Sequence, residues 1–64
     1  MKITVLEMIN EVEFLYEKEE RKAVKNIYRN TLKQLRQLPR DKMLDKDIIL
    51  NGIDKRIELI NAGA

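Results

Sequence analysis

The chain is 64 residues long, carries a formal net charge of +2, and contains neither cysteine nor histidine. At this length it forms one small domain over residues 1–64, because a chain of about 60 residues buries only about 60% of its unfolded surface. The absence of cysteine excludes disulfides, and the absence of both residue types argues against a structural zinc site. Stability must therefore come from well-packed helices or from self-association.

The clearest local signal is a capping box, in which Thr4 is followed three residues later by Glu7. In this motif the hydroxyl accepts a hydrogen bond from the N3 amide, and the Glu side chain reaches back to the N-cap amide. A helix is therefore predicted to begin at Val5. Its apolar residues recur at helical spacing; they are Val5, Met8, Ile9, Val12, Leu15 and Tyr16.

Phe14, the only phenylalanine, lies about 180° from Val5 on this predicted helix, among polar residues. A single exposed apolar residue is common and needs no function. The alternative interpretation is an anchor for a partner protein or a second protomer.

Residues 21–40 hold seven basic residues and no acid. At 100° per residue, six of them fall within about 60° of one line along a helix; we call them the basic stripe: Lys22, Lys25, Arg29, Lys33, Arg36 and Arg40. The opposite side carries Val24, Ile27, Tyr28, Thr31, Leu35 and Leu38. Pro39 is expected to end the helix after Leu38. The stripe is a candidate contact for a polyanion or a protein partner.

The boundary between these two helical stretches is ambiguous. Residues 17–22 contain no residue typical of a cap or turn, which favours one helix over residues 5–38. The apolar side, however, rotates by about 90° between the two halves. Either the helix continues and offers different faces to different neighbours, or it breaks near residues 17–22 to give a three-helix bundle. We favour the continuous or kinked helix.

Residues 39–45 are predicted to connect to a last helix, with Asp45 as its N-cap and an end near Asn61. Its apolar residues are Ile49, Leu50, Ile53, Ile57 and Ile60. Asn51-Gly52 is also a hairpin-turn signal, but the spacing after Gly52 is helical. A glycine inside a helix costs about 1 kcal/mol relative to Ala, so we interpret Gly52 as permitting a close helix–helix approach.

The predicted fold is all-α: a helical hairpin with a long, continuous or kinked first arm, or a three-helix bundle, in either case dimerising. The expected core combines the apolar residues of all three stretches: Val5, Met8, Ile9, Val12, Leu15, Val24, Ile27, Leu35, Ile49, Ile53, Ile57 and Ile60.

We expect no enzymatic activity, since the chain lacks His, Cys and Ser and with them the usual bases and nucleophiles. The acidic pairs Glu13–Glu17 and Glu7–Glu11 are interpreted as solvated helix faces. No catalytic, cofactor-binding or metal-binding residue is assigned, and no cofactor or small-molecule substrate is expected. There is no long apolar run, so we expect a cytoplasmic protein without a membrane partner.

Net charge is −4 over residues 1–20, +7 over residues 21–40 and −1 over residues 41–64. Such blocks pair within an assembly or meet a charged partner. The favoured hypothesis is a non-enzymatic protein-interaction or regulatory module, an adapter or inhibitor that binds another protein and itself as a homodimer. The alternative is nucleic-acid binding through the basic stripe. In composition the chain is similar to accessory proteins of low-GC bacteria and their phages or plasmids.

Overall fold

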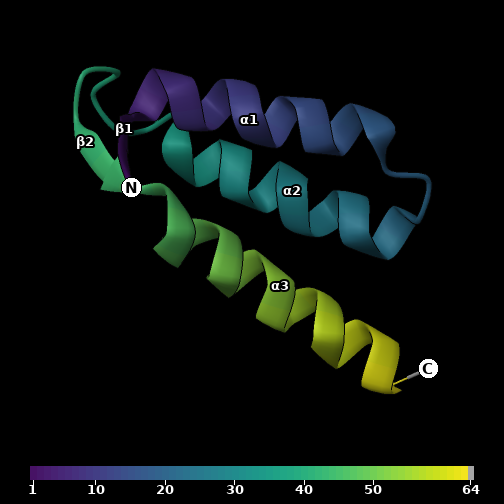
Figure 1. Ribbon diagram of the computed structural model, residues 1–64. Coiled ribbons are helices and arrows are strands. Elements are labelled where there is room, and N and C mark those ends of the chain that lie inside the picture. Colours follow the sequence, from purple (N-terminus) through teal and green to yellow (C-terminus); the bar gives the residue numbers. More distant parts are fainter. Residues whose placement is uncertain (64) are drawn as a thin grey trace.

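The structure is a computed structural model that describes residues 1–63. Its elements in chain order are strand β1 (Lys2–Thr4), helix α1 (Val5–Lys18), helix α2 (Lys22–Leu35), strand β2 (Met43–Asp45) and helix α3 (Lys46–Gly63) (Figure 1). The three helices contain 14, 14 and 18 residues. The mostly helical fold class is therefore confirmed, whereas the two short strands were not predicted.

Helices α1 and α2 are separate and form an antiparallel hairpin (Figure 1). The favoured continuous or kinked helix over residues 5–38 is wrong, because Glu19 (φ −82°, ψ 132°) and Arg21 (φ −76°, ψ 121°) have extended backbones. No side chain caps the start of α2. Packing, not local chemistry, makes this break: folding back buries the apolar sides of both helices against each other. The 90° rotation of the apolar side was the correct signal.

Strands β1 and β2 pair antiparallel, with Ile3 opposite Leu44, and this pairing supplies the caps of α1. The predicted capping box is present: the Glu7 amide donates to Thr4 Oγ1 at 3.1 Å, and the Thr4 amide donates to Glu7 Oε1 at 2.9 Å. The amide of Val5 donates to the carbonyl of Lys42 at 2.8 Å, and that of Leu6 to the carbonyl of Arg40 at 3.1 Å. The first three N–H groups of α1, which have no partner inside a helix, are thus all satisfied.

Helix α3 starts in the same way from the other strand. The Lys46 amide donates to the carbonyl of Met1 at 2.8 Å. Asp45 is the N-cap, as predicted: its Oδ1 accepts from the amides of Asp47 at 3.0 Å and Ile48 at 3.3 Å. Each strand therefore ends in a capping side chain. Because the strands are antiparallel, with Thr4 opposite Met43 and Lys2 opposite Asp45, α1 and α3 start from opposite ends of the ladder.

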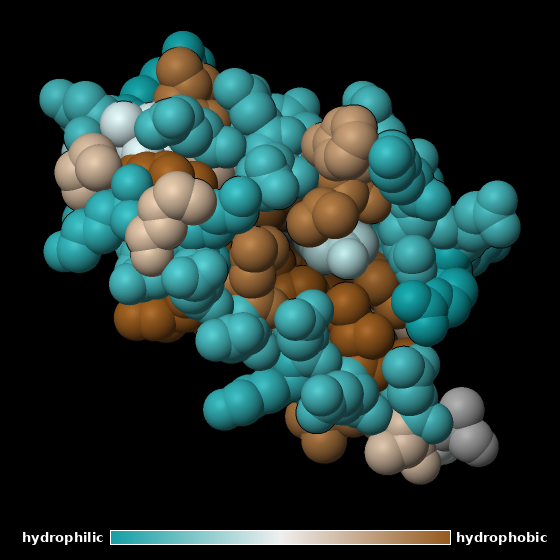
Figure 2. All heavy atoms as spheres, viewed as in Figure 1, coloured by the Kyte–Doolittle hydropathy of each residue, from teal (hydrophilic) through white to brown (hydrophobic). Residues whose placement is uncertain are grey.

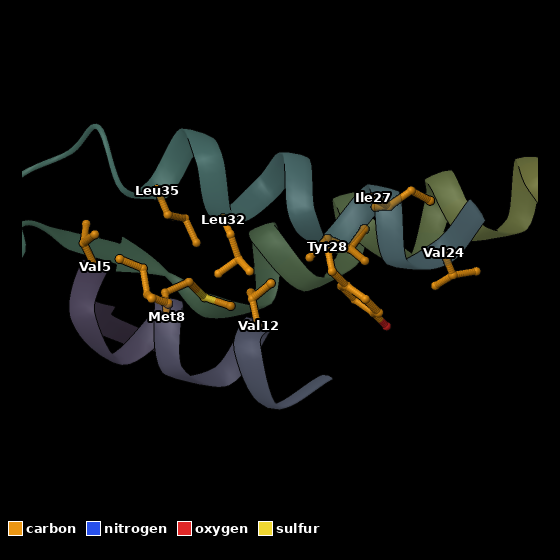
Figure 3. Packing of buried hydrophobic residues seen from close by; sticks show 10 residues of the cluster. Val5, Met8, Val12, Val24, Ile27, Tyr28, Leu32 and Leu35 are labelled. Carbon is orange, nitrogen blue, oxygen red and sulfur yellow. The ribbon is translucent and has the colours of Figure 1, made fainter. Parts of the chain in front are cut away.

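The core lies mainly between α1 and α2. Figure 3 shows Val5, Met8 and Val12 of α1 pointing towards α2. Ten hydrophobic residues are buried: Val5, Met8, Ile9, Val12, Val24, Ile27, Tyr28, Leu32, Leu35 and Ile53. Only the last of these belongs to α3, so the third helix contributes less to the core than the sequence predicted.

The predicted core differs from the observed one in two respects. Leu32 and Tyr28 are buried although both were left out of the predicted core. Tyr28 lies on the predicted apolar side of α2, and Leu32 is buried because α1 covers the flank of α2 between that side and the basic stripe. Four predicted core residues are only partly buried against the cluster: Leu15, Ile49, Ile57 and Ile60. Three of these four lie on α3, which diverges from the hairpin towards its C-terminal end (Figure 1).

The end of α2 and the role of Gly52 also differ from prediction. Helix α2 ends at Leu35, and the next turn is tighter, with the amides of Gln37 and Leu38 donating to carbonyls three residues earlier. The interpretation of Gly52 as a close approach between helices of this chain is wrong. A Cβ at this position would meet no atom within 4 Å outside its own helix backbone, so nothing else in residues 1–63 packs against this glycine.

The uneven core predicts different costs for one substitution at two leucines. Leu32 is 5% exposed and Leu59 is 73% exposed. We expect Leu32→Ala to lower the free energy of unfolding by about 2–5 kcal/mol, and Leu59→Ala to change it by about 0.5 kcal/mol or less. Urea unfolding followed by circular dichroism measures both, and equal losses would contradict the assigned core.

The capping box predicts an acid-dependent loss of stability. Hydrogen bonds from the backbone and side chain of Thr4 lower the pKa of Glu7 below its ordinary value of 4.5. A lowered pKa in the folded state means that the stabilisation is present above pH 4.5 and is lost as pH falls through the folded pKa.

A glutamine at N3 keeps the capping geometry without the charge. We therefore expect the stability advantage of wild type over Glu7→Gln to shrink on going from pH 6 to pH 3. The same comparison for Glu58→Gln, at an exposed site on α3, is the control. A difference that does not change with pH would show that the Glu7 charge contributes nothing.

Candidate functional site

The structure divides the basic stripe into residues that contact α1 and residues that do not. Lys25, Arg29 and Arg36 lie beside α1. Lys22, Lys33 and Arg40 are exposed, and within residues 1–63 none of these three has a carboxylate within 4.0 Å. Arg40 lies beyond the end of α2, where its carbonyl accepts from Leu6. The stripe is therefore shorter as a helical surface than the sequence predicted.

The sequence did not predict that Tyr16 of α1 contacts Lys25 and Arg29 of the basic stripe. The guanidinium of Arg29 donates from Nη2 to the Tyr16 hydroxyl at 3.0 Å. Lys25 Nζ lies 4.6 Å from the centre of the Tyr16 ring, and Arg29 Cζ lies 5.9 Å from it, within the range of cation–π attraction. The position of Tyr16 at the flank of the apolar residues of α1 was the available signal.

The opposite charges of the first two helices also meet inside one chain. Arg36 Nη2 lies 3.9 Å from Glu13 Oε2, and Glu17 lines the same hollow as Arg29 and Arg36. This juxtaposition reduces the positive potential that the stripe presents to a polyanion. It also removes one reason for expecting α1 to pair with the stripe of a second protomer.

Phe14 projects away from the core and is 54% exposed. The ammonium of Lys18, one turn later, lies 4.3 Å from the centre of its ring. This exposure is what the sequence predicted from its angle on the helix. Because Lys18 lies over its ring, Phe14 is less available as an anchor than a bare aromatic side chain.

Three of the four acidic residues of α1 have structural partners. Glu7 belongs to the capping box, Glu13 faces Arg36, and Glu11 Oε1 lies 3.5 Å from Lys46 Nζ on α3. In the part of the chain that the structure describes, no three acidic side chains are grouped so that they could hold a metal ion. No helix within residues 1–63 has the length and apolar character needed to cross a bilayer.

A mostly apolar hollow lies between α2 and α3; we call it the α2–α3 groove. It has a volume of about 300 Å³, at the lower end of the range for ligand and partner sites. Its apolar lining consists of Leu35, Leu38, Leu44, Ile48, Ile49 and Ile53, and its other lining residues are Thr31, Gln34, Gly52 and Arg56.

Two features make the groove different from the other surfaces. Ile48 at its rim is 69% exposed, although burying an isoleucine side chain is worth about 1.5–3 kcal/mol. Arg56 is its only charged lining residue, and within residues 1–63 no carboxylate lies within 4.0 Å of it. Figure 2 shows that hydrophobic residues, in brown, also remain visible on the surface where α3 meets the hairpin.

Comparison with protein-family models, with curated proteins and with solved structures finds no match for this chain.

The Tyr16 contact predicts that the two tyrosines titrate separately. The hydrogen bond from Arg29, together with the charges of Arg29 and Lys25, lowers the pKa of Tyr16 below its ordinary value of 10.0. Burial, with smaller contributions from the charges of Glu19 and Asp54, raises the pKa of Tyr28 above that value.

Ultraviolet titration of the phenolate is therefore expected to show two steps, with Tyr16 ionising first. Arg29→Gln should move the first step to higher pH and leave the second unchanged, while Tyr28→Phe should remove the second. A single step in the wild-type protein would show that the Arg29–Tyr16 hydrogen bond does not form in solution.

Proposed function

We propose that the protein is a non-enzymatic protein-interaction or regulatory module, an adapter or inhibitor that binds another protein through the surface of its third helix. The observation that carries this proposal is the α2–α3 groove, where an apolar hollow of about 300 Å³ opens beside exposed Ile48. Apolar surface left in water is unfavourable by about 25 cal/mol per Å². A partner that covers this surface recovers that free energy.

The position of α3 supports the same proposal. The hairpin covers only some of the apolar residues of α3: Ile53 is buried, while Ile48 and Leu59 are mostly exposed. Contiguous exposed apolar surface on a small protein is typical of interaction sites. The prediction that the protein also forms a homodimer stays a prediction. A long helix over residues 5–38 would need a second protomer to cover its apolar side, but α1 and α2 cover each other.

Nucleic-acid binding through the basic stripe stays the weaker alternative. Three of its six side chains contact Tyr16 or Glu13, so only part of the stripe is available to phosphates. An affinity that depends on phosphate neutralisation scales with the number of free cations.

Site-specific photo-crosslinking tests the proposed function. A photoreactive amino acid at Gln34, an exposed residue that lines the groove, places its probe there without filling the gap at Gly52. In cells of the organism that encodes the chain, we expect a discrete adduct with a second protein. An adduct of two copies of this chain would instead support the homodimer.

The same amino acid at Asn26, an exposed position of α2 that does not line the groove, is the matched control. It is expected to give no discrete adduct. Absence of adducts from position 34, with the variant folded by circular dichroism, would contradict the proposal.

A further inference from the structure

We infer that the occupant of the α2–α3 groove is an amphipathic helix of another protein that carries carboxylates beside its apolar side chains. This inference rests on the proposed function and adds the chemistry of the partner. Three observations carry it: a notch at Gly52, an arginine at the groove without an acidic neighbour, and the lack of any acid in the groove lining.

The notch is formed by a row of side chains along α3. Ile48, Gly52 and Arg56 are spaced four residues apart, so they form one ridge on the helix surface. Gly52 interrupts this ridge, and a Cβ there would meet nothing within 4 Å. A gap in a ridge accepts a side chain of a facing helix or lets its backbone approach closely. Because no part of residues 1–63 uses the gap, it is available to a helix from outside the chain.

The apolar lining determines the other half of the partner. Leu38, Leu44 and Ile49 all line the groove. Leu38 follows α2, Leu44 lies on β2 and Ile49 lies on the first turn of α3. A helix that lies in such a groove inserts apolar side chains spaced three or four residues apart. The hollow of about 300 Å³ has room for a few such side chains, which fits a short helical segment.

The charges of the groove determine the sign of the partner. Arg56 is the only charged lining residue, and its neighbour Lys55 is exposed. Within residues 1–63 neither has a carboxylate within 4.0 Å. A guanidinium beside an apolar hollow favours a carboxylate, because arginine offers paired donors that match its two oxygens.

The same charges argue against a second copy of the chain in the groove. Two grooves facing each other would give Arg56 no carboxylate from either lining, because neither lining contains an acid. A guanidinium left without a carboxylate at an interface is unfavourable. An acidic helix of a different protein has no such penalty.

Two designed 18-residue helical peptides with a fluorescent label test this inference. Both carry leucines at helical spacing; the flanking positions are glutamate in one and lysine in the other. By fluorescence anisotropy we expect the glutamate peptide to bind at least about tenfold more tightly than the lysine peptide, a difference of about 1.4 kcal/mol. Arg56→Glu should weaken binding of the glutamate peptide by about tenfold.

Matched variants separate groove binding from general attraction to a basic protein. Lys33→Glu makes the same charge change at an exposed site outside the groove, and is expected to change the affinity less than about threefold. Gly52→Leu fills the notch and should weaken binding at least about tenfold, whereas Asn51→Leu, an exposed neighbour that does not line the groove, should not. Circular dichroism of each variant checks that it folds.

The outcomes are distinguishable. Equal affinities for both peptides, lost together in Gly52→Leu, would overturn the acidic partner while leaving the groove as the interaction site. Binding of neither peptide at about 1 mM would overturn the inference, whereas the proposed function is judged separately by crosslinking from position 34. A wild-type dimer by light scattering that Gly52→Leu dissociates would overturn it in favour of a second copy.

Discussion

The pairing of two three-residue strands determines how the helices of this protein are placed. Strands β1 and β2 pair over residues 2–4 and 43–45, and at each end of the ladder the carbonyl of a residue that precedes a strand accepts an amide from the first turn of a helix. Helix N–H groups that are neither bonded nor solvated are costly. The ladder satisfies them for α1 and α3 together, so it joins residues 1–4 to residues 42–46 and fixes where both helices start.

The groove follows from this attachment. The third helix is held at its N-terminal end by the ladder and by the Lys46–Glu11 ion pair, and it is packed in its middle through Ile53. Beyond that point its backbone diverges from the hairpin (Figure 1), and the remaining contacts are the partial burial of Ile57 and Ile60 and a hydrogen bond that Arg21 donates to Asn61 at 3.3 Å. The hairpin is compact because its two helices match in length, so α1 and α2 use each other's apolar sides. The third helix has no such match, and part of its apolar surface stays uncovered.

Local chemistry in the sequence predicted the helix starts well but not the tertiary contacts. Thr4 and Asp45 identify the starts of α1 and α3 because capping depends on residues within three positions of each other. The break between α1 and α2 has no local marker, and only the rotation of the apolar side indicated it. The strands were missed because three residues are too short to show an alternating pattern.

The burial of Leu32 and the contact of Tyr16 with Arg29 were missed for a related reason. Both depend on how the neighbouring helix packs, which the pattern of one helix does not show. Gly52 was recognised as unusual, but the sequence alone does not say whether the space beside a glycine is filled.

The distribution of charge shows why the most charged stretch is not the best candidate site. The basic stripe dominates the sequence, yet Arg29, Lys25 and Arg36 contact α1, which carries four of the eleven acids of the chain. The field of the stripe is thus partly compensated inside the molecule.

Arg56 belongs to a stretch whose net charge is slightly negative, and nothing in the sequence distinguishes it. The fold places it without a nearby carboxylate beside an apolar hollow, where a charge interacts more strongly than it does in open water. A single cation in that environment contributes more to selecting a partner than several cations that already have neighbours, and for this reason the third helix, not the second, is the surface on which function is proposed.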